Sequence, residues 1–388
     1  MIRFLLYLLV FISFTDLFAQ LPITSTYAQN LHAATAMIGF IVGAYSLSNL
    51  FSNVFAGHFV DRSGPKTVML LGFLTNAVIL FLYAVVTSPV QLLIVRLLNG
   101  ITAGVITPAA FTYISLANLG RGSGQQMAYS GAAVGLAAIS GPAFSGIVSS
   151  AHSHEMVYVI LAVLMAIGTL LTLLLKPLRP ETDAKEAKEK ETKTTVKDYL
   201  PLLKNKGLLL GFTGAFSLAA SQGVLAYMLP LKVRALDMET HISGMLMSVF
   251  GIVAIVFFVL PINRVFDRGR NEIILAVGLL LGAFAQTLNG LVATLPLFIL
   301  SMSIYGIGFA FIFPSMSTLI SKYSPAELRG KAFGLFYGFF SIGSFLGSSL
   351  TGAFSLTPNQ GFINIAIFLV VISCIILFVS KSLAKKTV

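Results

Sequence analysis

Residues 57–66 read Gly-His-Phe-Val-Asp-Arg-Ser-Gly-Pro-Lys and separate two long apolar runs, at 37–57 and 67–87. Gly64 and Pro65 predict a tight reversal between the runs. Each run is about 20 residues long, the length that a helix needs to cross a bilayer core of ~30 Å. The stretch therefore predicts two membrane-spanning helices joined by a short polar loop.

Similar apolar runs recur along the whole chain. The 388 residues are 56% hydrophobic and only 10% charged, whereas a soluble domain carries about 25% charge. The runs do not alternate in polarity, as the strands of a membrane barrel would. We therefore expect an all-α integral membrane protein. The predicted spans are 4–22, 37–57, 67–87, 90–115, 125–150, 156–176, 207–230, 242–262, 272–290, 296–320, 332–354 and 361–380.

Basic residues are distributed unevenly between the predicted loops. Of the 25 Lys and Arg residues, 22 lie at the termini or in even-numbered loops, Lys232 and Arg234 lie in an odd-numbered loop, and Arg96 lies in a span. This positive-inside pattern predicts cytoplasmic termini in a multi-pass protein of the cell (inner or plasma) membrane. The net charge of +11 thus follows topology and does not indicate a nucleic-acid partner. A cleaved secretory signal in the first 22 residues, the alternative, would place every basic loop on the wrong side.

A polar segment at 177–206 divides the spans six and six. It interleaves acidic residues with lysines and is predicted to be a cytoplasmic linker, with a regulatory or partner-binding role as the alternative. The predicted domains are an N-terminal six-helix bundle at 1–176, the linker, and a C-terminal six-helix bundle at 207–388.

The two halves also resemble each other at a nearly constant offset. Asp61-Arg62 recurs as Asp267-Arg268 after 206 residues, and Gly100 matches Gly308 after 208. Two six-helix halves in tandem, with a site between them at mid-membrane, are an architecture typical of secondary transporters.

The loop at 57–66 resembles the loop 2–3 motif of the major facilitator superfamily, Gly-x-x-x-Asp-Arg-x-Gly-x-Lys/Arg. The resemblance extends over essentially the whole chain and implies that superfamily's fold, twelve transmembrane helices in two pseudo-symmetric six-helix bundles. In the second copy of the motif Asn263 replaces the glycine, and one residue is missing before Gly269. The family implies a latch that holds the cytoplasmic gate closed; a plain topogenic turn is the alternative. The gating residues so implied are Gly57, Asp61, Arg62, Gly64, Lys66, Arg121, Asp267 and Arg268.

Two charged residues, Asp16 and Arg96, lie well inside predicted spans. A charge in hydrocarbon costs at least ~2.5–3.5 kcal/mol, so each is expected to have a partner or a task. The segment from Arg96 to Gly104 resembles the span 4 motif that the superfamily ties to proton coupling. Our hypothesis is that Asp16 carries the proton, and that Arg96 controls its ionisation by approaching or withdrawing. A permanent structural ion pair is the alternative.

The fifth predicted span contains Gly135 and the run Gly141-Pro142-Ala143-Phe144-Ser145-Gly146. Pro142 removes one intrahelical hydrogen bond, while the glycines allow close approach of another helix. The run resembles the Gly-Pro-x-x-Gly-Gly motif of drug/proton antiporters, with Ser145 in place of one glycine. Antiporter-type export is thereby implied through Gly135, Gly141, Pro142 and Gly146, and small-residue packing is the alternative.

Spans 1, 4, 7 and 10 line the substrate cavity in the superfamily, with spans 2, 5, 8 and 11 beside them. This resemblance makes nine polar or aromatic residues candidates for the cavity, although helix packing would explain each of them as well. They are Gln20, Tyr45, Asn49, Asn99, Tyr113, Gln222, Tyr227, Tyr305 and Tyr337.

Signatures of other site classes are missing from the sequence. Gly330-Lys331 is followed by Ala332 and so makes no P-loop, and neither His-Glu-x-x-His nor Gly-x-Ser-x-Gly occurs. Cys374 is the only cysteine. His152 and His154 are predicted to lie in a solvated external loop, with metal binding as the alternative. We therefore expect no enzyme activity, no cofactor and no bound metal, with an ion gradient as the energy source.

These observations together predict a proton-coupled secondary transporter that exports small organic molecules by alternating access. Its expected partners are a small-molecule substrate, protons and the lipid bilayer, and we expect a monomer. The alternatives are a dedicated exporter of an endogenous anionic metabolite such as a metallophore or siderophore, a proton-coupled nutrient importer, and a membrane-embedded lipid flippase or sensor.

Overall fold

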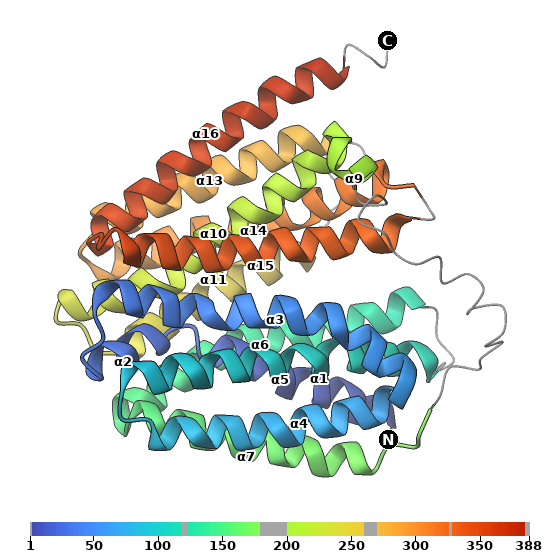
Figure 1. Cartoon of the computed structure of the whole chain (residues 1–388). Helices are drawn as coiled ribbons and strands as arrows, with labels where there is room; N and C mark the ends of the chain where they lie inside the picture. The colour runs from blue at the N-terminus through green and yellow to red at the C-terminus, as the bar shows by residue number, and fades with distance from the viewer. Residues whose placement is uncertain (1, 118–122, 179–199, 260–269, 326–327, 385–388) are drawn as a thin grey trace. The chain divides into compact units, whose positions relative to one another are not determined.

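The computed structural model of the chain describes residues 2–117, 123–178, 200–259, 270–325 and 328–384, and every element in these ranges is helical (Figure 1). Eleven of the described helices are long and apolar enough to cross a membrane. The number reaches twelve if the bent pair α1 (Ile2–Ala19) and α2 (Thr24–Asn30) counts as one span.

The other helices follow in chain order and are joined by short turns where the connection is described. They are α3 (Thr35–Ser63), α4 (Pro65–Leu82), η1 (Tyr83–Val85, a 3-10 turn), α5 (Pro89–Leu116), α6 (Ser123–Ala151), α7 (His154–Leu173), α9 (Leu200–Lys204), α10 (Lys206–Ala235), α11 (His241–Val259), α13 (Asn271–Leu291), α14 (Leu295–Tyr323), α15 (Arg329–Ala353) and α16 (Pro358–Ala384).

The chain forms two compact units. Unit 1 consists of Met1–Ala33, Ala44–Lys193 and Glu239–Gly244. Unit 2 consists of Ala34–Gly43, Thr194–Met238 and Met245–Val388.

The first span departs from the predicted run at 4–22, because α1 ends at Ala19 and the chain bends by 47° into α2. Pro22 explains the break: it has no N–H to donate, and its ring would clash with the carbonyl of Phe18 in a continuous helix. The helical hydrogen bonds resume when the Thr24 N–H donates to the Gln20 carbonyl at 3.1 Å. The bend brings the polar residues of α2 beside the end of α1.

The placement of Lys232 and Arg234 in a loop is wrong. Helix α10 continues past the predicted end at 230 and includes both residues. Lys232 is only 4% exposed, and its ammonium group donates to the carbonyls of Asn289 and Gly290 at 2.5 and 2.8 Å. These are among the last carbonyls of α13, where a positive charge is favourable, and this contact explains why a lysine is tolerated in a buried helix.

In unit 1, α4 packs against α5 and α7, and α1 packs mainly against α6. Small residues bring these helices close together: Gly72 of α4 lies against Ile106 of α5, and Gly168 of α7 lies against the Phe73 ring of α4. Close packing of this kind drives helix association in lipid, where a hydrophobic force between helices is missing.

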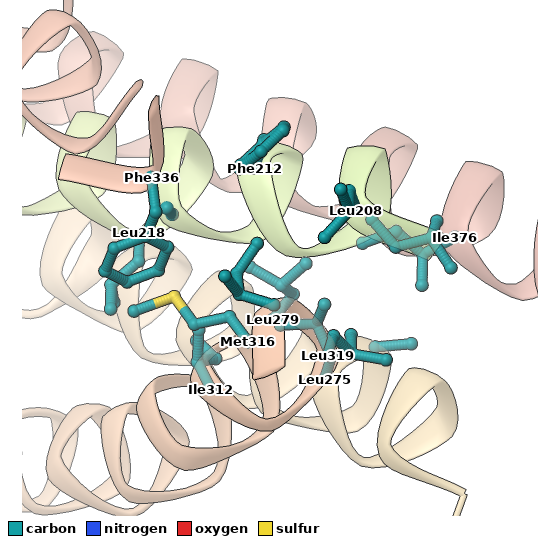
Figure 2. Packing of buried hydrophobic residues seen from close by; sticks show 14 of the residues in the cluster. Leu208, Phe212, Leu218, Leu275, Leu279, Ile312, Met316, Leu319, Phe336 and Ile376 are labelled. Atoms are coloured by element: carbon teal, nitrogen blue, oxygen red, sulfur yellow. The ribbon is translucent and has the colours of Figure 1, made fainter. Parts of the chain in front are cut away.

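Unit 2 is built around α10, which packs against α15, α16, α14 and α13. Figure 2 shows how leucines of α10 and α13 interdigitate with Ile312 and Met316 of α14, while Phe336 and Ile376 enter from α15 and α16. A few buried serines lie among these apolar side chains, and Ser373 of α16 donates to the Ala276 carbonyl of α13 at 2.9 Å.

Candidate functional site

A buried polar cluster lies around Asp16, near the end of α1, and Asp16 itself is 0% exposed. Its Oδ1 accepts a hydrogen bond from Gln20 Nε2 at 2.6 Å. Its Oδ2 accepts from Asn76 Nδ2 of α4 at 2.9 Å and from Asn99 Nδ2 of α5 at 3.4 Å. Three amide donors from three parts of the chain therefore surround one carboxyl group, and they offset the cost of burying it.

Arg96 joins this cluster through Gln20. The guanidinium donates from NH1 to Gln20 Oε1, while the other end of the same amide donates to Asp16. The guanidinium carbon also lies 5.1 Å from the centre of the Tyr45 ring, a distance at which a cation is attracted by an aromatic face. The two charges that the sequence singles out are therefore linked by one side chain, and a movement of Gln20 would break both contacts.

The amides are themselves bound to one another. Asn99 Nδ2 donates to Asn76 Oδ1 at 2.8 Å, and Gln20 Nε2 donates to Asn99 Oδ1 at 3.0 Å. The hydroxyls of Thr102 and Tyr83 complete the shell, donating to Asn76 Oδ1 at 2.6 Å and to Asn99 Oδ1 at 3.2 Å. A network in which each amide oxygen already has a donor holds the carboxyl group in one defined position.

Sequence reasoning missed Asn76, Thr102 and Tyr83 as members of this cluster. The sequence does contain a signal, because Asn76 is a polar amide in the middle of the apolar run at 67–87. Such a residue in lipid needs a hydrogen-bonding partner.

The cavity candidates of the N-terminal half are placed in three different settings. Gln20 and Asn99 belong to the cluster, and Tyr45 lies against Arg96. Asn49 of α3 donates to the Gly100 carbonyl of α5 at 3.3 Å, so it joins two helices. Tyr113 lies toward the far end of α5 and donates to the Lys176 carbonyl at 2.8 Å.

The candidates of the C-terminal half are placed differently. Tyr305 of α14 belongs to a second buried polar cluster, where its hydroxyl donates to Ser221 Oγ at 3.1 Å, and Gln286 of α13 donates to the same oxygen at 2.7 Å. Gln222 is half-buried and Tyr227 is buried, both in α10. Tyr337 of α15 is 57% exposed.

The loop motif at 57–66 makes the predicted reversal between α3 and α4. Gly64 has φ +81°, which a residue with a side chain adopts only at a cost, and Pro65 follows as the first residue of α4. Asp61 and Arg62 are exposed at the end of α3, as is Gly57. The other predicted gating residues, Arg121, Asp267 and Arg268, lie outside the described residues.

Lys66 in this motif has a specific partner. Its ammonium donates to the carbonyls of Leu173 and Leu175, at the end of α7.

Lys66→Met is therefore expected to loosen the end of α7 and to raise amide hydrogen exchange over residues 171–178 on the order of fivefold. The reason is that each hydrogen bond from a charged donor contributes about 1.5–3 kcal/mol before solvent screening. Mass spectrometry of the purified protein measures this exchange. Lys176→Met, which alters an exposed neighbour, is the control, and equal exchange in both variants would contradict the assignment.

The glycine-proline motif lies within α6, which remains helical through Pro142. Gly135 is half-buried, and Gly141, Pro142 and Gly146 are buried. A Cβ atom at Gly141 would lie 3.0 Å from the Ala19 nitrogen and 3.1 Å from Phe18 Cβ. This glycine therefore lets α6 approach the end of α1, three residues from Asp16.

Comparisons with known proteins agree with this architecture. The sequence profile of the Major Facilitator Superfamily matches residues 6–260 and again 211–387. The chain belongs to the Major Facilitator Superfamily. It is therefore a multi-pass membrane transporter of small molecules and not an enzyme.

Relatives within the superfamily are named for drug resistance. The chain is 26% identical to Multidrug resistance protein 1 of Bacillus subtilis, over 91% of this chain and 90% of that protein. It is 23% identical to the Quinolone resistance protein NorA of Staphylococcus aureus, over 97% of this chain and 96% of that protein.

Solved structures show the same fold. The nucleoside transporter NupG has a TM-score of 0.79 at 21% identity and covers 99% of both chains. The peptide transporter POT in complex with sulfate has a TM-score of 0.80 at 15% identity, covering 98% of this chain and 94% of that one. The predicted all-α membrane fold is confirmed.

Proposed function

We propose that this superfamily member is a proton-coupled exporter of small organic molecules, similar in role to a drug/proton antiporter. The observation that carries the proposal is the fully buried Asp16 carboxyl group, held by three amides and linked through Gln20 to Arg96. Two of its relatives are named for multidrug and quinolone resistance, which supports export of drug-like compounds.

The hydrogen bonds of the cluster suggest how one proton would change it. The ionised carboxylate accepts from three amide N–H groups, whereas a protonated carboxyl must donate one hydrogen bond. Gln20 is then expected to turn, presenting its oxygen to Asp16 and withdrawing it from Arg96. Protonation of Asp16 would thus release Arg96, and α5 would lose one of its contacts with the end of α1, while the contact between Asn99 and Asp16 remains.

This rearrangement is the switch that we assign to alternating access. The protonated, released form would move between the two sides of the membrane, and export of one substrate would accompany entry of one proton. One charge moving down ~100 mV supplies about 2.3 kcal/mol, enough for roughly a 50-fold substrate gradient.

The remaining sequence expectations belong to the same proposal. The two six-helix bundles would rock about the substrate, with Asp61, Arg62 and Lys66 at the cytoplasmic gate and Gly141-Pro142 as a flexible contact beside α1. We also propose that both termini are cytoplasmic, that the cavity candidates line the pathway, and that the protein functions as a monomer in the lipid bilayer.

A second candidate function is export of an anionic metabolite. Arg96 donates to the neutral amide of Gln20 and lies over the Tyr45 ring, and a guanidinium binds a carboxylate more strongly than it binds an amide oxygen. In this version the substrate anion, and not only the proton, displaces Gln20.

Transport in proteoliposomes with an imposed pH gradient tests the proposal. We expect the gradient to drive the substrate against the direction of proton flow, and competition among unrelated organic cations would favour multidrug export. Inhibition by a single anionic class would favour the metabolite exporter. Accumulation in the same direction as proton flow would contradict both and would show a nutrient importer.

A further inference from the structure

His154, the first residue of α7, is buried although the sequence predicts a solvated loop for it. It is 9% exposed, and its ring stacks on Tyr27 of α2 with 5.6 Å between ring centres and 8° between planes. Nε2 lies 2.9 Å from Thr26 Oγ1, and Nδ1 lies 3.5 Å from Asn30 Nδ2. The bend after α1 places α2 against this histidine, a contact that spacing in the sequence does not reveal.

The two ring nitrogens face different surroundings. Thr26 donates its own hydroxyl hydrogen to the Ile23 carbonyl at 3.0 Å, so the threonine oxygen is set to accept from Nε2–H. Nδ1 then accepts from the amide of Asn30, which assigns the neutral tautomer protonated at Nε2. Asn30 is exposed, whereas Thr26 is buried. One nitrogen therefore faces the solvent side and the other faces the interior.

Separate hydroxyl contacts join α2 to residues beside Asp16. Thr24 Oγ1 lies 3.4 Å from the Tyr158 hydroxyl and donates to the Gln20 carbonyl at 2.7 Å. The Tyr158 ring stacks on the Tyr83 ring with 4.0 Å between centres and 1° between planes. Tyr83 in turn donates to Asn99, which contacts Asp16. All of these groups belong to unit 1 and lie at the same end of it.

We propose that His154 is the proton relay of this transporter, receiving protons at the surface and passing them through the hydroxyls of α2 and intervening water to Asp16. The proposal rests on the proton-coupled function inferred above and adds the route by which the proton reaches its carrier.

The proton transfers balance in three steps. Water delivers a proton to Nδ1 once the exposed Asn30 amide turns to present its oxygen, and the ring becomes an imidazolium. Thr26 Oγ1 then takes the proton from Nε2 and gives its own hydroxyl hydrogen, released from the Ile23 carbonyl, to water. Water in turn gives a proton to the Asp16 carboxylate. The ring is left neutral with its hydrogen on Nδ1, and exchange with water restores the original tautomer.

The titratable groups around His154 are compatible with this role. Tyr27 faces it from α2, Glu155 and Tyr158 belong to its own helix, and Tyr83 lies at the end of α4 behind Tyr158. Helix α6, which also packs on α7, contains no charged residue. Glu155 is thus the charged residue next to His154 in the chain, and Arg96 lies close enough to Tyr158 for the two side chains to interact.

The test compares His154→Gln with His152→Gln in proteoliposomes. Glutamine keeps a donor and an acceptor at position 154 but cannot carry a proton. We expect pH-driven exchange to fall on the order of tenfold at saturating substrate, and its pH dependence to change. Substrate affinity should not change. His152 is an exposed neighbour, and its variant should match the wild type.

Three further measurements distinguish a proton relay at His154 from a structural role of this residue, and failure of the relay from failure of the proposed function. Imidazole buffer should restore exchange in His154→Ala, because it supplies the missing proton carrier, whereas a merely structural role predicts no rescue. Thermal unfolding followed by circular dichroism checks that the variants fold. If His154→Gln kept the wild-type exchange rate and pH profile while Asp16→Asn lost proton coupling, the relay would be overturned. The proposed function would still stand. Intact coupling in Asp16→Asn would overturn the function itself.

Discussion

Asp16→Asn is expected to abolish proton-coupled exchange while leaving the protein folded and able to bind substrate. Asparagine has the shape of protonated aspartic acid, with one oxygen that accepts and one NH2 group that donates, but it cannot gain or lose a proton. Gln20 is then expected to stay turned toward position 16 and away from Arg96, as in the protonated form. We expect pH-driven transport to fall at least ~100-fold. Substrate-induced proton release from the purified protein, followed with a pH dye, should disappear as well.

Substrate counterflow provides the internal control, since exchange of labelled for unlabelled substrate needs no net movement of protons. It should persist in Asp16→Asn. Asp237→Asn is the matched variant, because it removes an exposed carboxylate between α10 and α11 and should leave transport unchanged. If Asp16→Asn still released protons on binding substrate, another group would be the carrier.

The sequence alone was enough to predict the membrane spans and the chain reversal within 57–66. Apolar runs of about 20 residues have one stable solution in lipid, a helix, and Gly64-Pro65 is a turn with a local mechanism. The ends of two predicted spans were wrong, and each of these ends lies at a proline. Pro22 ended α1 earlier than expected, whereas Pro230 lies inside α10, which continues to Ala235.

Of the residues around Asp16, the sequence clearly indicated only the two charged ones. Asp16 and Arg96 stand out because a formal charge in lipid is costly wherever its helix faces. The neutral members do not stand out, since Asn76 or Thr102 would be tolerated on several faces of a helix, and facing depends on how helices pack. For the same reason the sequence did not show that Gln20 lies between the two charges.

Gly100→Ala is expected to disrupt the packing of α5 against α3 and to lower the stability of unit 1. A Cβ atom at this position would collide with the Tyr45 carbonyl and the Ser48 hydroxyl, and would lie 3.1 Å from Tyr45 Cα. Backbone atoms cannot move aside as a flexible side chain would, so the two helices must separate. Overpacking of this kind costs about 1–3 kcal/mol, and displacement of Tyr45 would also disturb its contact with Arg96.

Gly131→Ala is the matched control, because a Cβ at that position in α6 meets nothing within 4 Å. Alanine favours helix over glycine by ~1 kcal/mol, so this variant should unfold at the same temperature as the wild type or higher, while Gly100→Ala unfolds earlier. Circular dichroism at 222 nm in detergent measures both transitions. Equal stabilisation of the two variants would show that α3 and α5 do not approach at Gly100, and the position of Arg96 against Tyr45 would then need another explanation.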